Sequence, residues 1–225
     1  MTDLFTYLRE RSYPGRGILL GATPTGKSVC VYFIMGRSEN SRNRVFEATE
    51  NGLRTRAFDE SKVEDPSLIL YNAVCRRDEG IIVTNGAQTD VIEHCLMFQG
   101  TFEQALRGCT FEPDSPNFTP RISGMLSYGR YQLSILKTLD GNPSMCQRFF
   151  YEYEPLAGIG HFISTYEGFG SPLPSFSGEP VCVEIPDVPT QTLAARLWDA
   201  LNADNKVSLY VEIGGEEPVI INKNV

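Results

Sequence analysis

Apolar and polar residues alternate along most of the chain in short blocks, a pattern typical of β-strands. The blocks are rich in β-branched and aromatic residues, and Gly, Pro, Asn and Asp separate them. We expect strands over residues 17–20, 28–35, 44–49, 53–58, 81–84, 131–139, 148–154, 160–166, 180–185, 207–213 and 218–221. Asn51-Gly52 is a favoured hairpin turn, and Pro24-Thr25-Gly26 and Gly214-Gly215 also join consecutive strands. Antiparallel pairing is therefore expected.

Other segments carry the signals of short helices. We expect helices over residues 4–8, capped by Thr2 or Asp3, and over 65–72, 89–98, 101–107 and 190–201. Asp65-Pro66 is a good helix start, which places Tyr71 and Asn72 on the helix that follows. The pattern predicts an α+β fold in which residues 1–225 form one domain, with enough antiparallel strands for two sheets and with helices covering them.

Composition supports a globular protein of the cytosol. Hydrophobic residues make up 41% of the chain, and the longest apolar run, residues 29–35, is too short to cross a bilayer. The start of the chain, Met1-Thr2-Asp3, lacks the basic-then-apolar pattern of a secretory signal. The cysteines contain no C-x-x-C pair and only two histidines accompany them, so we expect buried, reduced thiols and no metal site. These cysteines are Cys30, Cys75, Cys95, Cys109, Cys146 and Cys182.

The net charge of −8 argues against a nucleic-acid binder or a protein that binds acidic membranes, because the molecule as a whole repels polyanions. A small phosphate ester can still bind where a few arginines converge, since guanidinium groups pair with phosphate oxygens. Arg37, Arg42 and Arg44 lie close together in the sequence and form such a cluster.

Residues 21–28 match the P-loop pattern G-x-x-x-x-G-K-[ST]. A P-loop needs a helix that begins at its lysine, but Lys27 is followed by a β-branched and aromatic run of poor helix propensity. We interpret the segment as a hairpin turn, and a P-loop NTPase remains the third-ranked alternative. Thr2 precedes a helix rather than opening a buried strand, so helix capping explains it better than an N-terminal nucleophile does.

Four polar stretches lie where simple packing does not require polarity, and each alone is unspecific. Residues 36–44 are a candidate phosphate clamp, although a solvated loop is the plainer interpretation. Residues 83–90 run from a strand through a Gly-containing turn into a helix, which exposes backbone N–H groups to a phosphate or heterocycle. Residues 117–122 contain a lone arginine, and residues 166–176 form a Gly-, Pro- and Ser-rich loop that leads to Glu179.

Together these stretches resemble the archaeal-type IMP cyclohydrolase family. The resemblance rests on Gly15-Arg16, on Arg37-Ser38 to Asn43-Arg44, on Asn85-Gly86-x-Gln88-Thr89-Asp90, on Thr119-Pro120-Arg121-Ile122 and on Tyr166-Glu167-Gly168. It spans residues 12–186, the 36–44 loop is longer than in the archaeal form, and residues 187–225 carry no matching motif. The resemblance implies a four-layer αββα sandwich like that of N-terminal nucleophile hydrolases, without their nucleophile.

The resemblance also implies the reaction, in which a formamido-imidazole-carboxamide ribonucleotide loses water to give inosine monophosphate. Ring closure needs orientation of the substrate, a base for the carboxamide nitrogen and a donor for the formyl oxygen, but no metal or other cofactor. As hypotheses, we assign proton transfer or donor roles to Tyr71, Asn72, Asp90 and Glu167. We assign substrate binding to Arg16, Arg37, Ser38, Asn43, Arg44, Asn85, Gly86, Gln88, Thr89, Thr119 and Arg121.

Two other functions remain open at the level of sequence. One is a hydrolase of the same fold that acts on another amide or nucleotide, and the other is a regulatory domain that binds a nucleotide without chemistry. The expected partner is a nucleoside monophosphate substrate, with no nucleic acid and no membrane. We also expect a homo-oligomer, because edge strands such as residues 207–213 can pair between subunits.

Overall fold

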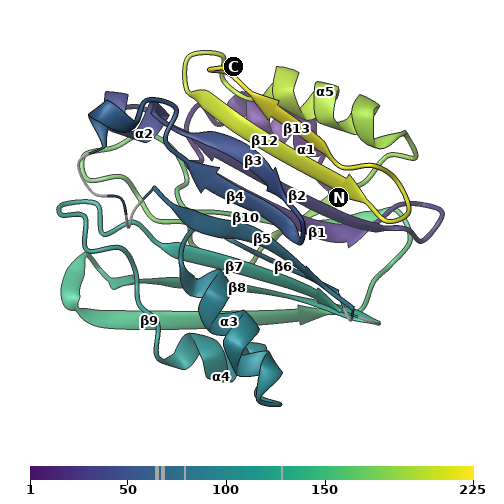
Figure 1. Cartoon of the computed structure of the whole chain (residues 1–225), viewed down its shortest axis with the longest axis horizontal. Coiled ribbons are helices and arrows are strands. Elements are labelled where there is room, and N and C mark those ends of the chain that lie inside the picture. Colours follow the sequence, from purple (N-terminus) through teal and green to yellow (C-terminus); the bar gives the residue numbers. More distant parts are fainter. Residues whose placement is uncertain (64–65, 67–68, 79, 128) are drawn as a thin grey trace.

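Two antiparallel β-sheets form the centre of the protein (Figure 1). This computed structural model describes residues 1–63, 66, 69–78, 80–127 and 129–225. The six-stranded sheet has the order β11-β10-β1-β2-β12-β13, and the seven-stranded sheet has the order β3-β4-β5-β6-β7-β8-β9. The predicted α+β class, with two antiparallel sheets and helices beside them, is confirmed.

The strands of the six-stranded sheet are β1 (Arg16–Ala22), β2 (Ser28–Met35), β10 (Ile159–Ser164), β11 (Val181–Glu184), β12 (Lys206–Ile213) and β13 (Val219–Asn222). Those of the seven-stranded sheet are β3 (Val45–Thr49), β4 (Gly52–Arg56), β5 (Tyr71–Arg77), β6 (Gly80–Thr84), β7 (Arg121–Ser127), β8 (Arg130–Leu139) and β9 (Asn142–Tyr153). The helices are α1 (Leu4–Glu10), α2 (Glu39–Arg42), α3 (Gln88–Met97), α4 (Phe102–Arg107) and α5 (Thr190–Ala200), with one 3-10 turn, η1 (Glu60–Lys62).

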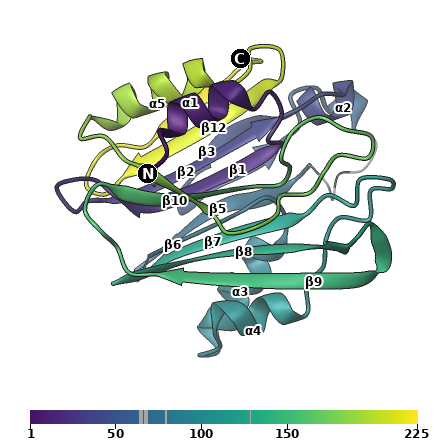
Figure 2. The same ribbon diagram turned by 180° about the vertical axis from the view of Figure 1, so that it is seen from behind.

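The sheets pack face to face because alternate residues of their strands are apolar and point inward. Ile18 and Leu20 of β1 meet Val83 of β6 and Ile122 of β7 in this central core. Each outer face is covered by a pair of helices (Figure 2). The sequence of layers is therefore helix, sheet, sheet, helix.

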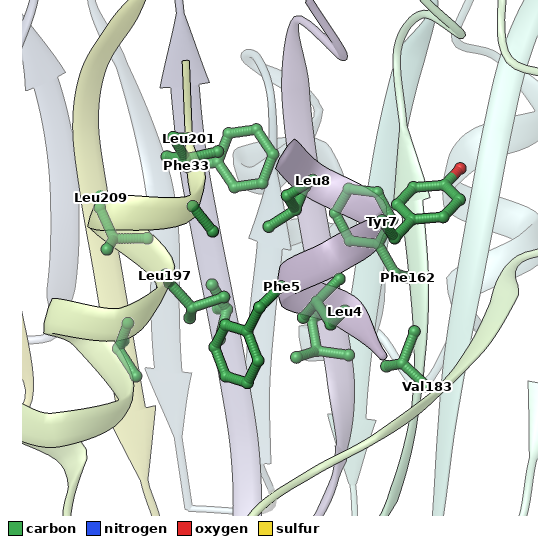
Figure 3. Close-up of a cluster of buried hydrophobic side chains, with 14 of the residues drawn as sticks. Leu4, Phe5, Tyr7, Leu8, Phe33, Phe162, Val183, Leu197, Leu201 and Leu209 are labelled. Carbon is green, nitrogen blue, oxygen red and sulfur yellow. The ribbon is translucent and has the colours of Figure 1, made fainter. Parts of the chain in front are cut away.

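Helices α1 and α5 cover the six-stranded sheet. The side chain of Asp3 accepts a hydrogen bond from the Thr6 backbone at 2.9 Å and caps α1, as predicted. Leu8 of α1 and Leu197 of α5 pack with Leu209 of β12 in one buried cluster (Figure 3). On the other side, α3 and α4 cover the seven-stranded sheet through a second outer cluster.

The P-loop-like segment is a hairpin turn between β1 and β2, as predicted. The Thr23 amide donates to the Lys27 carbonyl at 2.8 Å, and Gly26 has a φ of +80°. Strand β2 begins at Ser28, so no helix follows the lysine. The Lys27 ammonium instead lies 3.0 Å from Glu216. The geometry that a P-loop requires is not present at these residues.

The helix predicted over residues 65–72 is wrong at its C-terminal part. Tyr71 begins strand β5, which pairs with β4 and β6. The Pro66 carbonyl accepts from the amides of Ile69 and Leu70, and the positions 64, 65, 67 and 68 lie outside the described residues. Sheet pairing on both sides overrides the local helix signal, because tertiary context outweighs propensity.

Strand β7 and helix α2 were not predicted from the sequence. Gly124 and two serines interrupt the apolar pattern of β7, yet this strand lies inside the seven-stranded sheet. A Cβ atom on Gly124 would lie 2.9 Å from the Leu20 side chain, so the missing side chain allows close packing of the sheets there.

Two further expectations need correction. Strand β12 (residues 207–213 in the prediction) is not an edge strand, because it lies between β2 and β13. All six cysteines are free thiols, as predicted, but only Cys30 and Cys75 are buried and Cys182 is exposed.

In the described part of the chain, no helix has the length and apolarity needed to cross a membrane.

The central core yields a stability prediction. Leu20→Ala should lower the free energy of unfolding by about 2–5 kcal/mol, because Leu20 is fully buried between the sheets and its truncation leaves a cavity. Leu156→Ala is the matched control, since Leu156 is 60% exposed, and should cost less than about 0.5 kcal/mol. Urea denaturation followed by circular dichroism measures both. Equal losses for the two variants would contradict the assigned core.

Candidate functional site

Chain segments that are far apart in sequence meet at one end of the sandwich. Strand β1 begins there with Arg16, whose neighbour Gly17 pairs with Ser164 at the end of β10. In the other sheet, β6 ends at Thr84, which pairs with Ser123 near the start of β7. Side chains from both sheets touch at this end, and the residues described below line it.

Arg16 and Arg44 are buried at this end without a full set of partners. Their side chains are 7% and 5% exposed. Nε of Arg16, and Nε and Nη1 of Arg44, have no hydrogen-bond partner among the described residues. Buried polar groups are normally hydrogen-bonded, and a buried cation without a partner is costly. Such a pair indicates a site that a bound anion completes.

One carboxylate lies close to this pair. Oε1 of Glu112, which is 3% exposed, lies 4.0 Å from Nη2 of Arg16 and 2.9 Å from Nη1 of Arg121. Burial and the charge of Arg16 lower the pKa of Arg44. Burial also opposes the charge of Arg16, but Glu112 and nearby tyrosines outweigh it and raise the pKa of that guanidinium. Glu112 therefore contacts the guanidinium groups of Arg16 and Arg121, and it acts on Arg44 only through its charge.

Two buried tyrosines place hydroxyl groups beside the arginines. The hydroxyl oxygens of Tyr32 and Tyr71 lie 2.8 Å apart, one from each sheet. Burial raises the pKa of Tyr32 well above its usual value, so this phenol stays protonated at neutral pH. Tyr71 interacts electrostatically with both Arg16 and Arg44. The site thus combines positive charge with a hydroxyl that can donate or relay a proton.

Aromatic rings line the side of the site near Arg16. Tyr13 stacks between Tyr166 and Phe169, with ring centroids 6.1 and 5.5 Å apart. The Tyr166 hydroxyl lies 2.5 Å from Oγ1 of Thr119, and the Arg37 guanidinium lies 6.0 Å from the Tyr13 ring. Tyr13 and Tyr166 are buried and Phe169 is 56% exposed, so Phe169 is the ring of this stack on which a planar heterocycle can lie.

The predicted binding residues 85–89 hold their own turn together. Nδ2 of Asn85 donates to the Pro120 carbonyl at 2.9 Å, and its Oδ1 accepts from Gln88 and from the Ile122 amide. The hydroxyls of Thr84 and Thr89 lie 2.7 Å apart. Because these side chains already have partners, their present role is to fix the turn between β6 and α3.

Gly86 and Arg121 touch within this region. Nη1 of Arg121 donates to the Asn85 carbonyl at 2.9 Å. A Cβ atom on Gly86 would lie only 1.8 Å from the same nitrogen. The absence of a side chain at Gly86 therefore allows Arg121 to lie against the turn and to reach Glu112.

Some polar residues of the 36–44 loop hold the loop and α2 in place, and others lie at the surface. Ser38 caps α2, and Asn43 exchanges two hydrogen bonds with the backbone of Asp59. Arg37 is exposed and donates to the Gly170 carbonyl at 3.1 Å, which links this loop to the 166–176 loop. Of the arginines expected to form a clamp here, Arg44 alone joins the buried pair.

Three of the predicted catalytic residues lie away from the buried arginines. Asn72 donates to Asp90 at 2.9 Å, and both are exposed where α3 covers the outer face of the seven-stranded sheet. Glu167 is exposed and accepts hydrogen bonds from Ser177 within its own loop. The structure brings together Arg16, Arg44, Tyr71 and Arg121, with Thr119 next to them through Tyr166.

Comparison with known proteins assigns the family. Residues 13–217 match the sequence profile of the family described as IMP cyclohydrolase-like protein. The chain belongs to this family. The IMP cyclohydrolase of Methanopyrus kandleri is 28% identical over 185 residues, which cover 80% of this chain and 82% of that protein. The IMP cyclohydrolase of Methanococcus aeolicus is 26% identical over 160 residues, which cover 69% and 74%.

The family match extends beyond the motifs that the sequence analysis used, because it reaches residue 217. Three residues of this IMP cyclohydrolase-like site were not assigned roles from the sequence, namely Tyr32, Glu112 and Tyr13. Tyr32 lies in an apolar run and is indistinguishable there from a core residue. Glu112 lies between Phe111 and Pro113 in the sequence. An acidic residue next to apolar neighbours was the one sequence signal that could have indicated a buried, paired carboxylate.

Anion binding at the arginine pair can be measured directly. Inorganic phosphate should raise the melting temperature of the protein, because an anion that binds only the folded state stabilises it by mass action. Arg44→Met should reduce this rise. Without phosphate, Arg44→Met should melt at the same or a higher temperature than the unaltered protein, because one of two repelling buried cations is gone.

Arg9→Met provides the matched control, since Arg9 is an exposed arginine on α1. Differential scanning fluorimetry across a phosphate series compares the three proteins. A phosphate response in Arg44→Met as large as that of the unaltered protein would place the anion elsewhere.

Proposed function

We propose that this chain is an IMP cyclohydrolase, which closes the ring of 5-formamidoimidazole-4-carboxamide ribonucleotide to give inosine monophosphate and water. The observation that carries the proposal is the buried pair Arg16 and Arg44, short of partners and next to the Tyr32–Tyr71 hydroxyl pair. Two relatives that bear the name IMP cyclohydrolase and align over most of this chain support it.

The reaction makes two demands at one place. The carboxamide nitrogen bonds to the formyl carbon and gives up a proton, while the formyl oxygen gains negative charge and then accepts a proton. Elimination of the resulting hydroxyl with a second nitrogen-bound hydrogen releases water. Positive charge and a proton donor must therefore converge on the formyl oxygen.

Arg16, Arg44 and Tyr71 match that demand. Fixed charges in a buried setting stabilise a developing oxyanion more strongly than they would in water. Tyr71 is the donor, and Tyr32, held protonated by burial, supports it through their hydrogen bond. Glu112 acts as a positioning residue, since it holds Arg16 and Arg121 from one side.

The remaining groups suit binding of the nucleotide. Arg37 is exposed at the edge of the site, where it can bind the 5′-phosphate of the substrate. The exposed ring of Phe169, which stacks on the buried Tyr13, offers a surface for the imidazole ring. We leave Asn72, Asp90 and Glu167 out of the proposed catalytic set because their partners lie away from the arginine pair.

We further propose that residues 1–225 act as one domain, with the αββα architecture of N-terminal nucleophile hydrolases but without their nucleophile. The Thr2 amide donates to the Cys182 carbonyl at 3.2 Å, and Thr2 bridges to Val183. These contacts engage Thr2 at the edge strand β11, which supports a structural role for this residue.

Replacement of the proposed donor tests the chemistry. Tyr71→Phe should lower kcat by about 100-fold or more, because it removes the hydroxyl while keeping the packed ring. Absorbance at ultraviolet wavelengths follows conversion of the formamido ribonucleotide to inosine monophosphate. Tyr151→Phe, which loses a hydroxyl bonded to the Gly178 carbonyl, is the control and should keep near-normal turnover.

Two outcomes would contradict parts of this proposal. Binding of the ribonucleotide without turnover in the unaltered protein supports a regulatory nucleotide-binding domain. Equal loss in Tyr71→Phe and Tyr151→Phe would remove Tyr71 from the mechanism.

The two arginine roles predict opposite kinetic signatures. Arg44→Met should lower kcat with a smaller change in KM, because its charge is needed most in the transition state. Arg37→Met should raise KM with kcat nearly unchanged, because phosphate binding is common to ground and transition states. Steady-state kinetics of both variants in the absorbance assay distinguish the roles. A mainly raised KM in Arg44→Met would assign the buried pair to the phosphate instead.

A further inference from the structure

Strand β9 is the long free edge of the seven-stranded sheet. It runs from Asn142 to Tyr153 and pairs with β8 on one side. In the described part of the chain, no strand pairs with its other side. Figures 1 and 2 both show β9 running the full width of the sheet at its margin. An uncovered edge presents unpaired backbone N–H and C=O groups that another strand can bind.

The other sheet edges are short, and two of them are visibly covered. Both amide atoms of Asn222 bond the backbone of Phe46 in β3, at 2.8 and 3.0 Å. Thr2 bridges to Val183 in β11. The last edge, β13, spans only Val219–Asn222. In contrast, β9 is twelve residues long and Met145 and Phe149 on it are exposed.

The sequence of β9 is complementary to itself, and in one register the opposite charges and the aromatic pairs all lie within the strand. We infer that β9 pairs antiparallel with β9 of a second copy of this chain, with Phe150 opposite Phe150 at the twofold axis. This register pairs residues 147–153 of both copies and sets Arg148 opposite Glu152 twice. It also sets Phe149 opposite Tyr151 twice. Opposite charges and aromatic pairs directly across an antiparallel ladder stabilise it.

Neighbouring registers keep less of this complementarity. A centre on Tyr151 still sets Arg148 opposite Glu154, but Glu154 lies beyond the end of β9, and Phe150 then faces Glu152. A two-residue slip that centres the pair on Phe149 leaves Arg148 opposite Phe150, and a centre at Arg148 sets like charges opposite each other. Within a protomer, Arg148 donates to the Cys109 carbonyl at 2.8 Å and Glu152 lies 3.6 Å from Arg130. Both charges are thus held at the edge, and pairing aligns Arg130, Glu152 and the Arg148 of the second copy.

A charge-reversal series tests the register. The unaltered protein should be a dimer by sedimentation-velocity ultracentrifugation at micromolar concentration. Arg148→Glu and Glu152→Arg should each raise the dimer dissociation constant by about tenfold or more, because each sets two like-charge pairs across the axis. The double variant should restore the dimer, because it restores both opposite-charge pairs.

Circular dichroism and turnover should be unchanged in all three variants, since neither residue lies in the proposed site, and these readouts exclude unfolding as the cause. A monomeric unaltered protein would overturn the inference. Single variants that remain fully dimeric would do so as well, and would direct attention to the exposed Met97 and Phe98 at the end of α3.

Disulfide cross-linking tests the register independently of the charged pairs. The same pairing sets Cys146 opposite Glu154, so Glu154→Cys should form a covalent dimer on mild oxidation, because directly opposed residues lie within disulfide range. Glu154→Cys combined with Cys146→Ser is the matched control and should not cross-link. Cross-linking that survives Cys146→Ser would contradict the register.

Discussion

Two guanidinium groups buried between opposing sheets, with one carboxylate to share, are the interaction on which the rest of this structure depends. Arg16 and Arg44 repel each other, burial disfavours their charge, and Glu112 compensates them only in part. A sandwich filled entirely by apolar side chains would be more stable at this end. The anionic ligand that we propose accounts for the arrangement, because a bound anion would supply the partners that the protein lacks. On this proposal, the end of the sandwich is less stable than an apolar one because it serves binding.

The sandwich architecture makes this arrangement possible. Arg16 comes from one sheet, Tyr71 from the other, and Glu112 from the segment before β7. Antiparallel pairing brings the ends of several strands to the same end of the molecule, where loops can converge. Each sheet is backed on its outer face by packed helices. Charges held on rigid elements need little reorganisation when the reaction generates an oxyanion.

The segments that looked most like binding motifs in the sequence serve mainly structural purposes. The P-loop-like run is a hairpin turn, and the Asn85 and Gln88 amides bond to each other and to nearby backbone. Asn43 and Ser38 hold the loop and helix that lead to Arg44. These residues support the site from outside its centre. A sequence motif thus indicates which part of the chain lies near the site. The tertiary contacts of each motif residue determine whether its side chain is free to bind the proposed ligand.

The sequence by itself determined the antiparallel α+β scaffold, most strand positions and the family, because alternation, turn residues and motif order are local properties. It also placed Arg16, Arg44, Tyr71 and Arg121 among the candidates. Tertiary structure decided that Tyr71 lies on a strand rather than a helix, that Tyr32 meets it across the core, and that Glu112 joins two arginines. It also decided that β9, and not β12, is a free edge. These facts depend on contacts between residues distant in the chain, and no local pattern encodes which side chains will share a buried space.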